Sequence, residues 1–237
     1  VRKYGAYDDE AHTARLVDRA RRIGFNSVGA FSGRSPVFEQ KGFPRVESLP
    51  LNTWTLGPAL PGVRGVFDPF DEKNLAKMGE LFSKSVAEQA NDPLLIGYFL
   101  DNEQAFEDIP RAIPALPGKH ACKRELVARL RAKYKEIAAF NTAWGLDAAS
   151  FEALADRGLP LTTQDAFTDM QAYTEHFLDT YYRAITSAFR KVDKNHLLIG
   201  NRWQPGTANN ETLCRVAGRY MDVISINYYT CGIDAAF

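Results

Sequence analysis

The sequence has few of the residues that mark metal, redox or membrane proteins. It contains only three cysteines and four histidines, with no CxxC, HExxH or HxH spacing, so neither a metal site nor a cofactor is indicated. We expect Cys122, Cys214 and Cys231 to be buried or unreactive thiols, and their separation in sequence leaves a disulfide open. No stretch approaches 18 uninterrupted apolar residues, which argues against a membrane-spanning helix.

Neither basic nor acidic residues are in excess. The 29 basic residues balance the 29 acidic ones, so nothing indicates a nucleic-acid partner. The first residues, Val1–Gly5, contain neither an initiator Met nor an apolar signal core. No export signal is therefore visible in this chain.

Helical patterns alternate with short apolar runs along the chain. Apolar residues at helical spacing predict helices over 8–22, 72–89, 123–144, 168–192 and 211–220. Apolar runs bounded by Gly, Pro or Asn predict strands over 25–31, 46–49, 95–100, 197–201 and 222–227. Runs that are apolar on both faces are typical of parallel strands covered by helices. We expect an α/β fold with residues 1–237 as one domain, because no linker divides them.

Two parallel architectures fit this alternation. A doubly wound nucleotide-binding sheet needs a Gly-rich turn between strand and helix. The turns after 25–31 and 197–201 contain neither GxGxxG nor GxxxxGK[ST]. The length of 237 residues suits a (β/α)8 barrel, which takes about 250 residues. We therefore predict the barrel.

The tripeptide Asp101-Asn102-Glu103 directly follows the apolar run 95–100. Catalytic groups of (β/α)8 barrels lie at the carboxyl ends of the strands. A carboxylate partly removed from water there has a raised pKa and is suited to donate a proton. The alternative is a turn followed by a solvated helix. The tripeptide alone does not decide between the two.

The surrounding segments resemble the family 50 glycoside hydrolases, the β-agarase family. The segments that carry the resemblance are Gly24–Gly29 (GFNSVG), Val66–Phe70 (VFDPF), Asp92–Glu103 (DPLLIGYFLDNE), Phe140–Gly145 (FNTAWG), Ser150–Phe151 (SF), His196–Trp203 (HLLIGNRW) and Asp222–Tyr229 (DVISINYY). They occur in the family order along nearly the whole chain, and the segment ending in Asn-Glu is the most specific. The sequence departs from the family at Gln104-Ala105-Phe106 and at Ala30-Phe31, which puts agarose specificity in doubt.

This resemblance implies a retaining glycosidase in which Glu103 is the general acid/base. The predicted strands would be strands 2 to 6 of an incomplete barrel, with strand 1 before Val1 and strands 7 and 8 after Phe237. The nucleophile, a Glu at the end of strand 7, would then lie beyond this chain. A galactose-containing carbohydrate is the implied substrate, and secretion or export to the periplasm the implied location.

Further residues near strand ends are candidates for substrate binding, each with a structural alternative. They are Asn102, Asn201, Arg202, Trp203, Asn227, Tyr228, Tyr229 and Trp54. An Arg fork suits hydroxyls or a sulfate, and an aromatic face suits a sugar ring. Trp203 is equally well interpreted as a core residue, Arg202 as part of a surface ion pair, and Trp54 as a buried loop anchor. Two functional alternatives also stay open: a β-galactosidase-type barrel and a non-catalytic carbohydrate-binding homologue.

Overall fold

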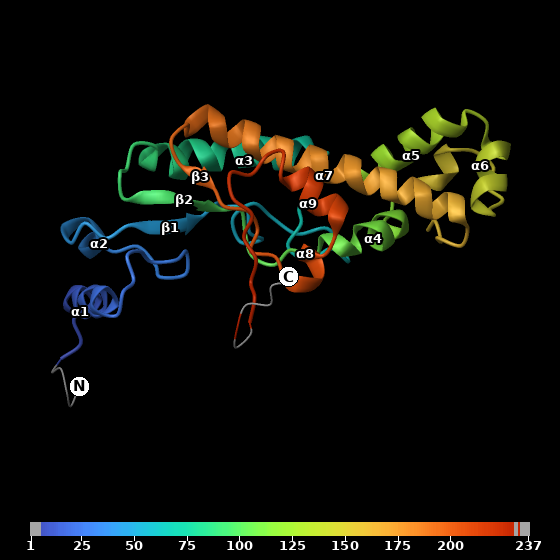
Figure 1. Cartoon of the computed structure of the whole chain (residues 1–237). Coiled ribbons are helices and arrows are strands. Elements are labelled where there is room, and N and C mark those ends of the chain that lie inside the picture. Colours follow the sequence, from blue (N-terminus) through green and yellow to red (C-terminus); the bar gives the residue numbers. More distant parts are fainter. Residues whose placement is uncertain (1–5, 230–231, 233–237) are drawn as a thin grey trace.

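A parallel β-sheet lies at the centre of the chain (Figure 1). The structure, a computed structural model, describes residues 6–229 and 232. Strands β1 (Arg45–Ser48), β2 (Leu95–Phe99) and β3 (Leu197–Leu198) pair in parallel in the order β1-β2-β3. Gly97 permits close approach of β2 and β3, because a Cβ at this position would lie 2.3 Å from the carbonyl oxygen of Leu197.

One further segment adds to each side of this sheet. Val28 forms a parallel bridge to Arg45, and Trp203 forms one to Ile226. Five parallel segments are therefore neighbours in sequence order, without the reversal of a doubly wound sheet. The named strands form a three-stranded sheet among the described residues.

The predicted strands over 25–31 and 222–227 are shorter than expected. In the described residues each segment is hydrogen-bonded to a neighbour on one side only and is assigned a single bridge. The expectation that 25–31 is buried is wrong, because Phe25 and Phe31 are both exposed. An edge position explains both differences, since no described element covers the outer side.

Helices cover the sheet and extend beyond it. The α-helices are α1 (Asp9–Arg22), α2 (Pro36–Gln40), α3 (Glu72–Leu81), α4 (Ile109–Ala115), α5 (Ala121–Tyr134), α6 (Ile137–Trp144), α7 (Gln164–Val192), α8 (Pro205–Ala208) and α9 (Glu211–Ala217). A π-helical turn, η1 (Phe82–Val86), and a 3-10 turn, η2 (Ala87–Gln89), continue α3; further 3-10 turns are η3 (Phe106–Asp108) and η4 (Glu152–Leu154). No described helix is long and apolar enough to cross a membrane.

The helix predicted over 123–144 is two helices. Lys135 ends α5 with φ 63°, and α6 begins after Glu136. Side-chain caps begin helices α1, α2, α3, α7 and α9. Asp8 accepts a hydrogen bond from the backbone of Ala11, and Thr163 caps α7 in the same way.

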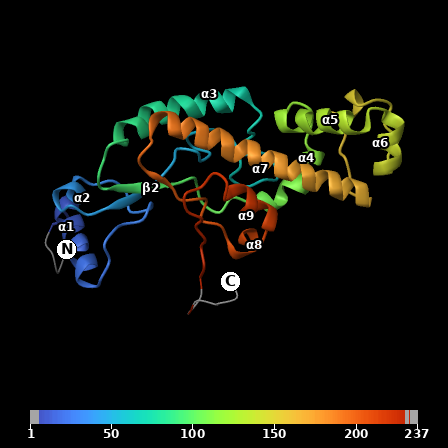
Figure 2. The ribbon, with the colours of Figure 1, turned by 45° about the horizontal axis from the view of Figure 1, so that its top comes forward.

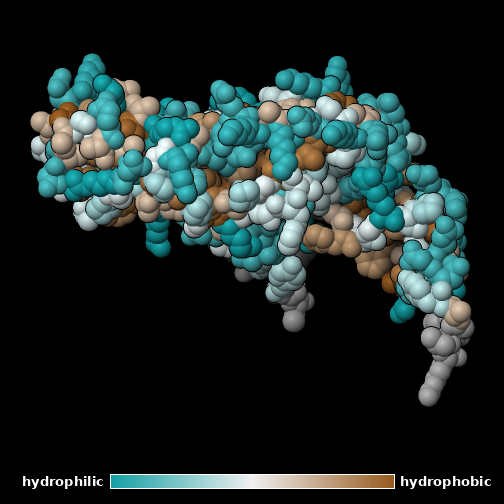
Figure 3. Space-filling model, turned by 180° about the vertical axis from the view of Figure 1, so that it is seen from behind, coloured by the Kyte–Doolittle hydropathy of each residue, from teal (hydrophilic) through white to brown (hydrophobic). Residues whose placement is uncertain are grey.

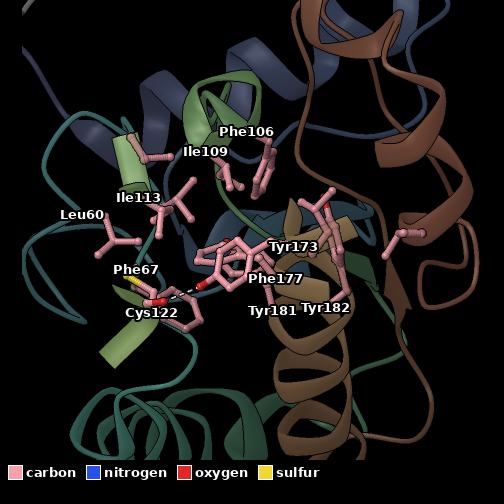
Figure 4. Packing of buried hydrophobic residues seen from close by; sticks show 14 of the residues in the cluster. Leu60, Phe67, Phe106, Ile109, Ile113, Cys122, Tyr173, Phe177, Tyr181 and Tyr182 are labelled. Atoms are coloured by element: carbon pink, nitrogen blue, oxygen red, sulfur yellow. Dashed lines mark hydrogen bonds between the residues drawn. The ribbon is translucent and has the colours of Figure 1, made fainter. Parts of the chain in front are cut away.

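Helix α7 connects the sheet to the helical end of the molecule. It runs beside α3 over the sheet and continues to α5 and α6 (Figures 1 and 2). Tyr98 of β2 packs against Phe189 of α7 with ring centroids 5.6 Å apart. Phe106 packs edge-on against Tyr181 at 5.4 Å (Figure 4). One large apolar cluster therefore includes residues from both regions. Seen from behind, the surface is largely hydrophilic with apolar residues between (Figure 3).

Trp144 is a buried core residue, and its indole nitrogen lies 2.9 Å from an Asp169 carboxylate oxygen. Cys122 is a buried free thiol and Cys214 a half-buried one. Cys231 lies outside the described residues.

His196 connects the loops that precede β2 and β3 through hydrogen bonds. His196 Nδ1 lies 2.7 Å from the carboxylate of Asp193, and His196 Nε2 lies 2.9 Å from the carbonyl oxygen of Asp92. Asp193 is fully buried and also accepts from the backbone nitrogens of Asn195 and His196. The imidazole thus connects two loops and compensates a carboxylate without access to water.

We predict that His196→Ala loosens the amino ends of β2 and β3. Leaving a buried polar group without its partner costs about 1–3 kcal/mol, so amide hydrogen exchange in 92–100 and 193–200 should be faster by about tenfold to a hundredfold. His12→Ala is the matched control, because His12 is half-exposed on α1. Unchanged exchange in both segments would contradict this role of His196.

Candidate active site

Polar side chains from neighbouring parallel segments meet at one edge of the sheet. Asn102 and Glu103 follow β2, Gln204 follows β3, and Asn227 follows the outer segment over 222–226. Because the segments are parallel, their carboxyl ends lie at the same edge. The structure therefore places Glu103 where the sequence predicted it, at the carboxyl ends of the strands.

The carboxylate of Glu103 is held by two amides. Asn227 Nδ2 donates to Oε1 at 2.8 Å, and Gln204 Nε2 donates to Oε2 at 3.1 Å. The backbone nitrogen of Glu103 donates to the carbonyl oxygen of Asn201 at 3.0 Å. Glu103 has φ 54°, a conformation that non-glycine residues adopt rarely and that is enriched at functional sites.

The expected rise in the pKa of Glu103 is wrong for this structure. The hydrogen bond from Asn227 is the largest cause of a lowered pKa, and Gln204, Arg64 and Arg202 lower it further against partial desolvation. Hydrogen bonds to the charged form favour that form. The carboxyl whose pKa is raised by burial is Asp101.

Hydrogen bonds determine the orientation of the Asn102 side chain. Its Oδ1 accepts from Arg202 Nε at 2.9 Å and from Asn227 Nδ2 at 3.3 Å. Since the oxygen faces two donors, the amide cannot be flipped without losing both bonds. The amino group of Asn102 consequently faces away from these donors and is available to donate to another acceptor.

Arg202 is held in place from several directions. It has φ 53°, and its backbone nitrogen donates to Ser225 Oγ at 2.9 Å. Its guanidinium carbon lies 4.7 Å from the centroid of the Phe31 ring and 5.1 Å from that of Phe99. The alternative interpretation as a surface ion pair is wrong among the described residues, because its ordered side-chain partner is Asn102.

A buried chain of amides and phenols lies beneath this edge. Tyr182 OH donates to Asn201 Oδ1 at 2.9 Å, Asn201 Nδ2 donates to Gln104 Oε1 at 2.7 Å, and Gln104 Nε2 donates to Tyr181 OH at 2.9 Å. Asn201 is fully buried, so its polar groups serve this network. The expectation that Asn201 contacts substrate is not met in this structure.

The aromatic candidates differ in their positions. Trp203 is fully buried, which corrects its expected place in the binding surface and agrees with the alternative of a core residue. Trp54 is 94% exposed, which rules out the buried-anchor alternative. Tyr229 is 82% exposed, and Tyr228 is half-buried with a partner of its own.

One residue at this edge, Gln204, was not predicted from the sequence, and it bonds to Glu103. The available signal was position, since Gln204 comes just after a parallel segment whose carboxyl end lies at this edge. Phe31, where the sequence departs from the family, covers Arg202. No group of three or more metal-ligating side chains lies together in the described part of the chain.

Comparisons with known proteins point to enzymes that act on agar. No protein-family model matches the chain. β-Agarase B of Vibrio sp. (strain JT0107) is 26% identical over 96% of this chain, and β-agarase A of the same strain is 26% identical over 93%. The solved structure of an exo-β-agarase superposes with a TM-score of 0.79 at 25% identity and covers 96% of the chain.

The similarity covers only part of each relative. The chain spans 26% and 24% of the two curated β-agarases and 33% of the exo-β-agarase structure. A β-galactosidase from the Antarctic haloarchaeon Halorubrum lacusprofundi has a TM-score of 0.66 over 95% of this chain and 39% of its own. At 14% identity, that likeness concerns the fold alone.

We predict that Asn227→Leu raises the pKa of Glu103. The substitution removes the strongest hydrogen bond to the ionised carboxylate, and losing such a bond favours the protonated form. The pKa can be measured by NMR titration of 13C-labelled glutamate, with Glu103→Gln identifying the signal. Asn209→Leu is the control, since Asn209 is exposed after α8. An unchanged or lower pKa in Asn227→Leu would contradict the assignment.

Proposed function

We propose, from its β-agarase-like sequence and structure, that this chain is part of a retaining glycoside hydrolase acting on galactose-containing polysaccharides. The resemblance to the family 50 β-agarases extends along nearly the whole chain. The observation that carries the proposal is the position of Asn102-Glu103 at the carboxyl edge of parallel segments, with both Glu103 oxygens accepting amide hydrogen bonds.

The proposed architecture is a (β/α)8 barrel of which this chain supplies strands 2 to 6 as one partial catalytic domain. Support comes from the five parallel segments that are neighbours in sequence order. Site residues at their carboxyl edge agree with the usual location of barrel active sites. Strands 1, 7 and 8 would be contributed by polypeptide outside residues 1–237.

In the first chemical step Glu103 would protonate the departing glycosidic oxygen. This requires a protonated carboxyl, although the hydrogen bonds from Asn227 and Gln204 favour the ionised form. In a retaining enzyme a second carboxylate lies about 5–5.5 Å away, and a like charge at that distance raises the pKa of its neighbour. Bound substrate would also exclude water. These two effects would favour the protonated form of Glu103, which the described residues alone do not favour.

In the second step Glu103 would act as a base. The first step leaves a covalent glycosyl-enzyme on the nucleophile, a Glu expected on strand 7. In the second step Glu103 removes a proton from the water that attacks the anomeric carbon, and the bond to the nucleophile carboxylate breaks. The ionised carboxylate is then the required form, and the two amide donors stabilise it. They therefore assist the second step more than the first.

Other residues would bind the sugar. The amino group of Asn102 is oriented to donate to a hydroxyl beside the cleaved bond. The exposed rings of Trp54 and Tyr229 are suited to stack on sugar rings. As in the secreted enzymes that the resemblance implies, the substrate would be an external polysaccharide. A β-galactosidase-type activity and carbohydrate binding without turnover are the alternatives, to be separated by product analysis.

We predict that Glu103→Gln in the full-length enzyme lowers kcat by about 10²–10⁴ on substrates with poor leaving groups, because general acid catalysis contributes that much. The loss should be smaller on aryl galactosides with good leaving groups. Glu107→Gln is the matched control, as Glu107 is exposed and bonds to Thr207. Unchanged turnover of poor-leaving-group substrates by Glu103→Gln would exclude the proposed role.

We also predict that Trp54→Ala raises KM for the polysaccharide by about fivefold, since aromatic stacking contributes on the order of 1 kcal/mol. Turnover of a small aryl galactoside should stay unchanged, because one sugar does not reach an outlying platform. Steady-state kinetics on both substrates test this. An equal loss on both would show that Trp54 acts on the fold or the catalytic centre.

A further inference from the structure

The guanidinium of Arg202 is fixed beside Glu103 before any ligand binds. Its Nε donates to Asn102, and its guanidinium carbon lies over the rings of Phe31 and Phe99. Cation–π contacts and this hydrogen bond restrict a side chain that is otherwise flexible. A preorganised guanidinium loses little conformational entropy when it binds a ligand.

No ion pair to Arg202 is found among the residues that the structure describes. Eight other arginines pair with a carboxylate within 3.5 Å: Arg34, Arg45, Arg131, Arg157, Arg183, Arg190, Arg215 and Arg219. Arg202 is half-buried, and no described carboxylate forms a direct ion pair with it. The Glu103 carboxylate acts on its charge through space. The terminal nitrogens of Arg202 are therefore not engaged by a described carboxylate.

A second positive charge acts on the same region. Arg64 and Arg202 both lower the pKa of Glu103 through their charges. Arg64 is exposed. The edge thus combines two arginine charges with an exposed ring, because Phe31 is 69% exposed while it contacts Arg202.

We infer that Arg202, Phe31 and Phe99 form a subsite for an anionic substituent of the galactan. The inference rests on the proposed function and narrows its substrate class to acidic galactans, with a sulfate ester or a carboxylate on the sugar. The planar guanidinium presents parallel N–H donors that match two oxygens of such a group. The exposed Phe31 ring packs against the sugar that bears it.

The test measures binding in the Glu103→Gln background of the full-length enzyme, so that turnover does not interfere. Isothermal titration calorimetry would compare three galacto-oligosaccharides of equal length: neutral, sulfated, and bearing a pyruvate ketal. At least one anionic ligand should bind about tenfold tighter than the neutral one, as expected for a charge-assisted bond. The anionic ligand that binds more tightly identifies the substituent that the subsite accepts.

Arg202→Gln in the same background should abolish this preference and leave neutral binding within about twofold. Higher ionic strength should reduce the preference as well, because the charges are partly exposed. The matched control is Arg131→Gln, since Arg131 lies on α5 in an exposed ion pair with Glu152 and should keep the preference.

Three results would overturn the inference. These are equal affinities for all three ligands, an equal loss for neutral and anionic ligands in Arg202→Gln, and no binding of any galactan. An equal loss of affinity for neutral and anionic ligands would show that the guanidinium binds sugar hydroxyls or a protein carboxylate instead of an anionic substituent. The proposed function fails separately, if Glu103→Gln retains full turnover. An anionic preference that depends on Arg202 would stand in that case.

Discussion

The position of the candidate active site depends on a buried hydrogen-bonded chain of four side chains. Tyr182, Asn201, Gln104 and Tyr181 connect helix α7 to the residues that follow β2 and β3. Asn201 and Gln104 have almost no contact with water, so leaving one unpaired would cost about 1–3 kcal/mol. The network therefore favours a single arrangement of the two strand ends. Because Glu103 directly precedes Gln104, this arrangement also determines the position of Glu103.

Above this network the site is a compact set of charges and amides. One asparagine, Asn227, donates to both Glu103 and Asn102, and Arg202 donates to Asn102. Each side chain therefore orients the next one. The balance favours an ionised Glu103, which is the form needed to activate water. Bond cleavage needs the protonated form of Glu103, which the substrate and a second carboxylate have to favour. Catalysis would therefore require groups other than the described residues.

The sequence was informative where a local pattern determines the structure. The apolar run before Asp101 predicted β2 within a residue, and its parallel neighbours placed Glu103 at the correct edge. The break at Lys135 was missed because neither Gly nor Pro marks it, and Lys adopts a positive φ there. The outer segments were predicted as full strands because a sequence pattern does not show whether both edges are covered.

Side-chain directions after β3 were also beyond a sequence pattern. Gly200 and Arg202 have φ of 68° and 53°, so simple alternation does not apply, and Asn201 and Trp203 turn into the core. The pKa of Glu103 was predicted in the wrong direction because its strongest donor, Asn227, is 124 residues away. Such a contact follows from the tertiary structure and from no local motif.

The backbone conformation of Glu103 and Arg202 limits how the protein can be made more heat-resistant. Glycine or asparagine adopts a positive φ more easily than glutamate or arginine. A thermostabilisation programme that scores folding alone would thus select against the two side chains on which the proposed chemistry depends. Stability and activity compete at these positions, and engineering for industrial saccharification should hold both fixed while it varies the helical periphery around α5 and α6.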